Sequence, residues 1–353
     1  MRVADTRVAK LARSVGAVAL CSLALVACGK TATSAPASGT AGAPSAATQA
    51  APPAAVPPAQ VQATIDAAAQ IKALPSDITP PLQNAAGDQG TFVAQAVVGT
   101  VGGKQVSCNP TWTQVEVPAC VWGDPNGTHT LVLMGDSHAA QWIDAFDQVG
   151  KRLHWKIVLL TKSACGAPDI SFYDYANKGA YPACDQWHTY AINRINQLDP
   201  SVVVLSSDVV YPLNGHHQLI TASTWTAGLV KTLDAITAPG VQKIVLGDVP
   251  SLGNPYPGEV AANCLALHAS NVQACSTPTP IAIRAGLRQA DQAGAQQGGA
   301  SYIDVTPWFC SSTCTAVVGN MLVFADSGHI TNQYAAFLSG ELQAALQQDA
   351  HII

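Results

Sequence analysis

Residues 130–138 of the sequence read Thr-Leu-Val-Leu-Met-Gly-Asp-Ser-His. The first five form a short apolar run of the kind found in a buried strand, and Gly135 lets the chain turn sharply where that run ends. Apolar residues then recur at helical spacing through 139–153. The stretch therefore predicts a buried strand that passes through a tight turn into a helix, with Asp136, Ser137 and His138 at the turn.

The rest of the chain repeats this alternation of strand and helix. Short apolar runs lie at 156–160, 202–205, 243–246 and, more weakly, 301–305, and helical patterns lie at 185–198, 221–236, 280–297 and 333–348. Such alternation predicts an α/β domain with a mainly five-stranded parallel sheet and helices on both faces. Ligands of these sheets bind at the carboxyl ends of the strands, so the residues just after each strand are the candidates for chemistry.

The N-terminus has the pattern of an export signal. Four basic residues precede an apolar stretch at 14–27, which is shorter than the about 20 residues of a membrane-spanning helix and is typical of a secretory signal. It ends in Leu25-Val26-Ala27-Cys28, which resembles the bacterial lipobox, where a peptidase cuts before the cysteine and the cysteine carries diacylglycerol. We expect lipidation of Cys28; an ordinary signal peptide with a chance cysteine is the alternative.

The segment after Cys28 is built from few residue types. Residues 28–60 are almost entirely Ala, Pro, Ser, Thr and Gly, which predicts a flexible linker. We therefore expect a signal peptide at 1–27, a linker at 28–60 and one domain at 61–353, which opens with a short helix and a proline-rich strap. A lipid on Cys28 would anchor the protein to a membrane, outside the cytoplasm, without spanning it.

Composition excludes some classes of protein and indicates an oxidising compartment. Only 11% of the 353 residues are charged and the net charge is −5, which disfavours a nucleic-acid partner. Apart from Cys21 in the signal and Cys28, eight cysteines form four sequence-local couples. We expect each couple to form a disulfide: Cys108 with Cys120, Cys165 with Cys184, Cys264 with Cys275, and Cys310 with Cys314. No pair has the spacing of a zinc site, so no metal or other cofactor is expected.

Two short motifs carry the candidate chemistry. Ser137 at the strand-to-helix turn could act as a nucleophile, with backbone N–H groups placed for a developing oxyanion; the alternative is that it only caps the helix. Asp326 and His329 form an Asp-x-x-His motif just before the last helix. A serine nucleophile needs a histidine base, and the base needs a carboxylate to orient it. The two motifs together favour catalysis.

These motifs resemble the SGNH (GDSL-type) hydrolases, and more narrowly the SGNH domain fused to acyltransferase-3-type membrane O-acyltransferases. The resemblance covers roughly residues 70–350, in order. It is carried by Gly-Asp-Ser-His at 135–138, the segments 120–125, 161–165, 184–187, 202–208 and 245–252, the cysteine couples, and Phe-Ala-Asp-Ser-Gly-His at 324–329.

The resemblance implies a three-layer α/β/α, flavodoxin-like fold and a Ser137–His329–Asp326 triad. Its oxyanion hole would use the Ser137 N–H and a second donor near Gly166. Most SGNH hydrolases add an asparagine after the third strand; here Ser207 stands at that position, as in the acyltransferase-linked subgroup. We expect His138 to support the site or to face the substrate.

The expected function is that of an extracytoplasmic serine esterase or O-acyltransferase. It would act on acyl groups, acetyl above all, of envelope polysaccharides or glycolipids. Both activities begin with the same acyl-enzyme. In the fused family a membrane domain is thought to deliver the acyl group; here a separate membrane acyltransferase would supply it, or the protein would remove acyl groups. The alternative is a non-catalytic, glycan-binding lipoprotein on the same scaffold.

Overall fold

The computed structural model describes residues 53–85, 98–101, 104–118, 120–210, 212–252, 260–283, 285–326 and 328–349. All of these belong to one structural unit, Ala51–Ile353. The predicted signal peptide, the predicted lipidation site Cys28 and most of the predicted linker lie outside the described residues.

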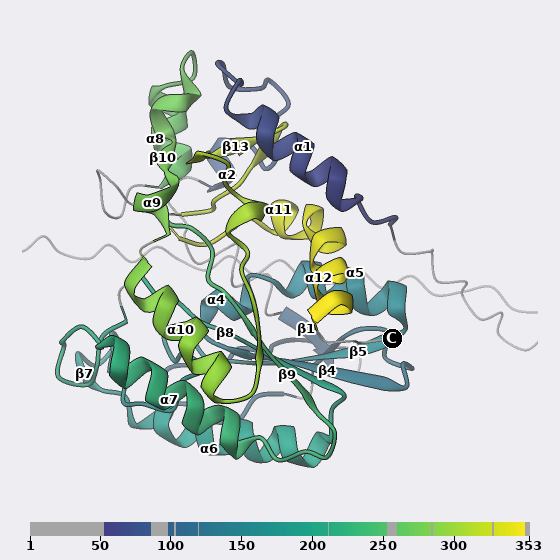
Figure 1. The fold of residues 1–353 in the computed structure, drawn as a ribbon, viewed down its shortest axis with the longest axis vertical. Helices are drawn as coiled ribbons and strands as arrows, with labels where there is room; N and C mark the ends of the chain where they lie inside the picture. The colour runs from purple at the N-terminus through teal and green to yellow at the C-terminus, as the bar shows by residue number, and fades with distance from the viewer. Residues whose placement is uncertain are drawn as a thin grey trace, which may run out of the picture. The chain divides into compact units, whose positions relative to one another are not determined.

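A six-stranded sheet forms the centre of this unit (Figure 1). Its strands, in spatial order, are β11 (Ser301–Ile303), β9 (Gln242–Leu246), β8 (Val202–Ser206), β4 (His129–Gly135), β5 (Trp155–Thr161) and β3 (Val121–Gly123). Five strands are parallel and only β3 is antiparallel, paired with β5 at one edge. The prediction of an α/β fold with a mainly five-stranded parallel sheet is confirmed.

The strand order places the candidate turn at the middle of the sheet. Read across the sheet from β5 to β11, the five parallel strands are the second, first, third, fourth and fifth in chain order. This is the flavodoxin-like order. The chain leaves β4 for β5 on one side and returns to β8 on the other, so the order reverses between β4 and β8. Ligands of such sheets bind outside the carboxyl ends of the strands at this reversal, which is where residues 135–138 lie.

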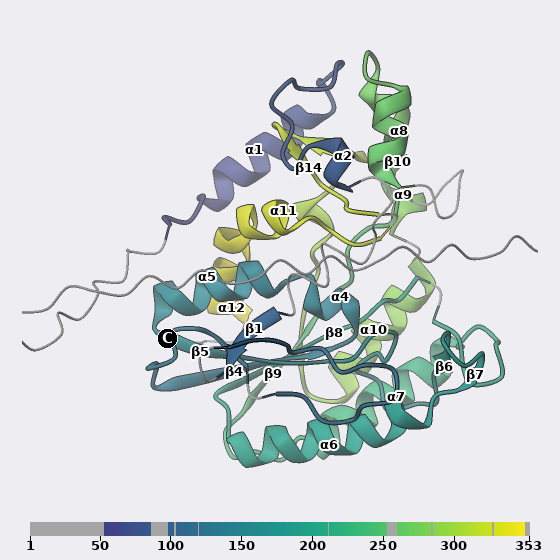
Figure 2. The ribbon, with the colours of Figure 1, turned by 180° about the vertical axis from the view of Figure 1, so that it is seen from behind.

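Helices cover both faces of the sheet (Figures 1 and 2). One face packs against α6 (Pro182–Leu198), α7 (Ala222–Ala235) and α10 (Ala285–Gln297). The other packs against α5 (Ile143–Leu153), α11 (Asn332–Phe337) and α12 (Ser339–Asp349). Val132 and Met134 of β4 belong to the first core, whereas Leu131 and Leu133 belong to the second. Burial on both faces explains why β4 is a continuous apolar run rather than an alternating one.

Smaller elements complete the unit. The remaining helices are α1 (Pro58–Ala68), α2 (Leu82–Ala85), α4 (Ser137–Ala140), α8 (Ala261–Leu267) and α9 (Thr279–Ala282), with 3-10 turns at Val272–Cys275 and Thr306–Trp308. Four two-stranded pairs join β1 (Val98–Val101) to β2 (Lys104–Ser107), β6 (Tyr173–Asp174) to β7 (Gly179–Ala180), β10 (Thr277–Pro278) to β12 (Thr313–Cys314), and β13 (Val317–Val318) to β14 (Met321–Leu322). Among the described helices, none is long and apolar enough to cross a membrane.

Three predicted helices are interrupted, which corrects the sequence-based expectation. The helix expected at 280–297 is found as α9 and α10. The helix expected at 139–153 is divided into α4 and α5, because the Trp142 N–H bonds to the Ala139 carbonyl three residues back rather than four. The helix expected at 333–348 is divided into α11 and α12 at Leu338, whose N–H is shared between the carbonyls of Tyr334 and Ala335. The spacing of apolar residues does not show where a helix changes from i→i−4 to i→i−3 hydrogen bonds.

The segment before β1 is part of the folded unit. Helix α1 begins at Pro58, just inside the stretch predicted as linker, and buries Val61 and Ile65. The strap after it, residues 70–81, forms main-chain hydrogen bonds with distant segments. Thr79 donates its N–H to the Asn320 carbonyl at 2.8 Å and accepts the N–H of Leu322 at 2.9 Å. The strap thus pairs with the stretch that leads into the Asp-x-x-His motif.

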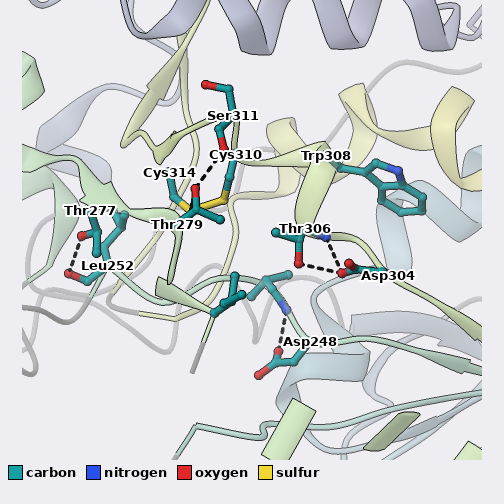
Figure 3. Close-up of a disulfide and its surroundings, with 12 residues drawn as sticks. Asp248, Leu252, Thr277, Thr279, Asp304, Thr306, Trp308, Cys310, Ser311 and Cys314 are labelled. Atoms are coloured by element: carbon teal, nitrogen blue, oxygen red, sulfur yellow. Dashed lines mark hydrogen bonds between the residues drawn. A yellow bond between two sulfur atoms is a disulfide. The ribbon is translucent and has the colours of Figure 1, made fainter. Parts of the chain in front are cut away.

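Four disulfides join the eight cysteines as nearest neighbours in the sequence. The pairs are Cys108–Cys120, Cys165–Cys184, Cys264–Cys275 and Cys310–Cys314, which is the pairing expected from their spacing. Figure 3 shows Cys310–Cys314 beside Thr279, whose hydroxyl donates to the Ser311 carbonyl at 3.0 Å. Cys165–Cys184 joins the loop after β5 to the first turn of α6, so it restrains a loop at the carboxyl edge of the sheet.

Candidate active site

In the turn after β4, Asp136 caps the helix and the hydroxyl of Ser137 is left for another contact. Gly135 has φ +152°, and a Cβ there would collide with the Ser206 carbonyl oxygen, so only glycine fits. Asp136 is the N-cap of α4 and its carboxylate accepts the His138 N–H at 2.8 Å. Ser137 is therefore not the capping residue, and its hydroxyl is available for another contact.

That contact is with His329. The Ser137 hydroxyl lies 2.8 Å from His329 Nε2, and His329 Nδ1 lies 2.7 Å from Asp326 Oδ2. Because an ionised carboxylate can only accept hydrogen bonds, Nδ1 carries the proton and Nε2 is left to accept the serine proton. The structure thus brings the three residues predicted from the two motifs into one hydrogen-bonded relay.

The carboxylate of Asp326 is held in its ionised form. Burial by itself would raise the pKa of this carboxyl, but the hydrogen bond and charge of His329 outweigh that effect. The backbone N–H groups of Gly328 and His329 also donate to Asp326 Oδ1, at 2.8 and 2.6 Å. The net result is a pKa below the ordinary value, so Asp326 is ionised at neutral pH and can stabilise a histidine cation.

A buried glutamine connects the turn that holds Ser137 to the segment that holds His329. Gln141 Nε2 donates to the His138 carbonyl at 3.0 Å, and Gln141 Oε1 accepts the Ile330 N–H at 2.8 Å. Ile330 follows His329 directly. Gln141 was not predicted as a site residue because it lies inside an apparent helix. The only signal in the sequence is a polar residue among apolar ones.

Gly166 and Ser207 lie together on the other side of the turn, after the two strands that flank β4. The Ser207 hydroxyl oxygen accepts the Ala167 N–H at 2.8 Å, and a Cβ on Gly166 would lie 3.3 Å from that oxygen. The Gly166 carbonyl accepts from His188 Nε2 at 2.7 Å, whereas its N–H bonds to none of the described residues. The two residues predicted for the oxyanion hole are therefore neighbours, with an N–H and a hydroxyl proton to offer.

His138 forms a second pair with a carboxylate. Its Nδ1 lies 2.6 Å from Asp248 Oδ1, and its ring centroid lies 4.6 Å from that of His329. Burial opposes the charged form of His138, but the negative charges of Asp248 and Asp208 outweigh it, so the pKa of His138 lies well above its ordinary value. The neighbouring carboxylates therefore favour the charged, doubly protonated form of His138.

Two groups of described residues come close enough together to hold a metal ion. The first is Cys165, Cys184 and His188, but both sulfurs are joined in a disulfide and cannot act as thiolate ligands. The second is His138, Asp208 and Asp248. There a metal would have to displace the proton that His138 Nδ1 shares with Asp248, so hydrogen bonding suits this arrangement better than metal binding.

Comparison with known proteins places the chain in a family. The family model described as "SGNH domain (fused to AT3 domains)" matches residues 107–344. Among solved structures, the periplasmic domain of a lipopolysaccharide acetyltransferase from Salmonella ser. Paratyphi A is similar, with 19% identity and a TM-score of 0.49 over 64% of this chain and 85% of that one. A GDSL-like lipase from Bacteroides thetaiotaomicron has 11% identity and a TM-score of 0.38 over 62% of this chain and 88% of that one.

No curated protein matches the chain. The family model, however, spans more than half of the sequence and contains both the Gly-Asp-Ser-His turn and the Asp-x-x-His motif. The chain therefore belongs to the family of SGNH domains that are fused to AT3 domains, and it is an SGNH-type hydrolase or acyltransferase.

Proposed function

We propose that the protein transfers acyl groups through an acyl-enzyme on Ser137. The observation that carries this proposal is the relay from Ser137 through His329 to Asp326, with hydrogen bonds of 2.8 and 2.7 Å. His329 Nε2 takes the serine proton as Oγ attacks the carbonyl carbon of an ester. The ionised Asp326 stabilises the imidazolium that forms, and His329 then returns the proton to the departing alcohol.

The oxyanion of the tetrahedral intermediate needs donors on the side opposite His329. The Ser137 N–H lies in the first turn of α4, where the helix has no acceptor for it. The Gly166 N–H and the hydroxyl proton of Ser207 complete the proposed hole. Because Ser207 Oγ already accepts the Ala167 N–H, its own proton is free to point toward the oxyanion, as an asparagine amide does at this position in other SGNH hydrolases.

The second half of the reaction decides between esterase and transferase. The acyl-enzyme carbonyl would be attacked by water or by a sugar hydroxyl, with His329 as the base in either case. The proposed substrates are acyl groups, acetyl above all, of envelope polysaccharides or glycolipids. Membership in the family of SGNH domains fused to AT3 domains supports this choice. If the protein acts as a transferase, the proposed acyl donor is a membrane acyltransferase.

The proposed location is outside the cytoplasm, on a lipid anchor at Cys28. Four disulfides support the first part, since such bonds persist in oxidising compartments. The lipobox-like sequence at 25–28 supports the second. Mass spectrometry of the protein from membranes of an expressing bacterium tests the anchor: we expect a peptide that begins at diacylglycerol-modified Cys28, and an unmodified N-terminus would contradict it.

Hydrolysis of p-nitrophenyl acetate tests the catalytic claim. We expect Ser137→Ala and His329→Ala each to lower kcat/KM by at least about 1000-fold, because residues that act as a unit fail together. Ser312→Ala and His216→Ala change the same residue types at exposed positions and serve as matched controls. Equal rates in wild type and in Ser137→Ala would contradict the proposal. Mass spectrometry of reactions with an added glycan then separates transfer to sugar from transfer to water.

A further inference from the structure

The candidate active site contains a histidine–carboxylate pair that the proposed acyl transfer does not use. His138 follows the nucleophile in sequence, and its ring is tilted by 57° against the ring of His329 at a centroid distance of 4.6 Å. The Ser137 hydroxyl bonds to His329, whereas His138 bonds to Asp248. A second imidazole therefore lies beside the base without taking part in its relay.

The charged groups around His138 favour its doubly protonated form. Four ionisable groups face it, one at the end of each neighbouring strand or before α11: Asp136, Asp208, Asp248 and His329. Behind Asp248, Arg288 of α10 donates to the carbonyls of Asp248 and Val249. Three carboxylates close by favour the imidazolium form of the ring, whose Nδ1–H is committed to Asp248.

The remaining N–H of His138, on Nε2, lies at the edge of the site. This atom has no hydrogen bond to any of the described residues, and the His138 side chain is 6% exposed. A Cβ added to Gly328 would lie 3.5 Å from His138 Cε1 and 3.8 Å from Nε2. The glycine next to His329 therefore places no side chain against the Cε1–Nε2 edge of His138.

We propose that His138 is a substrate-binding residue whose Nε2–H donates a hydrogen bond to the alcohol part of the ester, at an oxygen next to the one that carries the acyl group. The departing or attacking alcohol must reach His329 Nε2, and the neighbouring ring places a donor within reach of its next oxygen. This inference rests on the proposed function and assigns a residue that would recognise neighbouring hydroxyls on a neutral polyol such as a sugar. The three carboxylates around His138 disfavour an anionic group there.

Two esters of nearly equal shape test the inference. In 2-hydroxyethyl acetate the neighbouring oxygen is present, and in propyl acetate a methyl group replaces it. We expect the wild type to prefer the first ester by about 10- to 100-fold in kcat/KM, the range of a hydrogen bond to a charged donor. His138→Phe should abolish the preference, and His138→Gln, which keeps a donor, should retain part of it. A preference that survives unchanged in His138→Phe would overturn the inference.

A second variant and a second readout keep the test independent of folding and turnover. Gly328→Ala leaves His138 intact and should reduce the preference by covering its Nε2 edge. In the Ser137→Ala protein with ¹⁵N-labelled histidine, the imidazolium signal that is missing from His138→Gln should shift when 2-hydroxyethyl acetate is added and not when propyl acetate is added. A wild type that hydrolyses neither ester contradicts the proposed function, and an unchanged His138 signal contradicts this inference.

Discussion

The buried amide of Gln141 provides a direct test of how the site is held together. Gln141→Met keeps the volume of the side chain but removes its donor and its acceptor. The His138 carbonyl and the Ile330 N–H, which it joins at 3.0 and 2.8 Å, then lose their partners. Each buried backbone group left unpaired costs about 1–3 kcal/mol, so we expect the free energy of unfolding to fall by about 2–5 kcal/mol.

The same change should reduce activity beyond its effect on folding. Ile330 is the residue after the base, and a displacement of about 1 Å in a catalytic group costs on the order of 100-fold. We therefore expect kcat for p-nitrophenyl acetate to fall about 10- to 100-fold under conditions where the variant remains folded, with less change in KM. Urea denaturation followed by tryptophan fluorescence measures the stability, and initial rates measure kcat.

Gln292→Met, at an exposed position on α10, is the matched control and should change the free energy of unfolding by less than about 0.5 kcal/mol. If Gln141→Met lost stability but kept the wild-type kcat, the glutamine would support the fold without positioning the base. If it lost neither, the two hydrogen bonds would not be formed in solution, and the reasoning would be refuted.

Three further outcomes follow from the site and its core. Ser207→Ala leaves the Ala167 N–H unpaired and removes an oxyanion donor, so we expect stability to fall by about 1–3 kcal/mol and kcat by about 100-fold; a normal kcat would remove it from the oxyanion hole. Asp326→Asn should lower kcat by about 1000- to 10,000-fold with little change in KM, as steady-state kinetics would show. Burial raises the pKa of Asp291 to about 7, so the unfolded chain loses this proton first as pH rises. Urea denaturation at pH 4 and 8 should therefore show wild-type stability falling relative to Asp291→Asn, by a few kcal/mol, and equal pH dependence would contradict this.

The catalytic candidates were predictable because each lies next to an element that the sequence marks clearly. Ser137 follows the apolar run at 130–134, and Asp326 and His329 are neighbours in one short motif before a final helix. The sheet then needs only to bring the end of β4 near the start of α11. Residues that are close in the sequence are also close in the fold, so such motifs can be recognised locally. The resemblance to SGNH domains added the order of the segments.

The partners of His138 could not be predicted in the same way. Asp248 is 110 residues away and follows β9, which is separated from β4 by β8. Apolar periodicity identifies the strands. It does not show that a side chain after β9 contacts a side chain after β4 across the intervening strand β8. Strand β3 was missed because three residues ending in a glycine give no periodic signal. Gln141 was missed because its partner Ile330 is 189 residues away in the sequence, which apolar periodicity does not report.

The strap of residues 70–81 belongs to the folded unit although it lies outside the region that the family model matches. The family match begins at residue 107, yet the main chain of Leu322 bonds to Thr79. Four residues after Leu322 comes Asp326. A protein shortened to the matched region would therefore lose the main-chain partner of the segment that leads to Asp326 and His329. The folded unit is therefore larger than the region that the family model matches. Residues 70–81, which precede that region, pair with the segment that leads to the candidate active site.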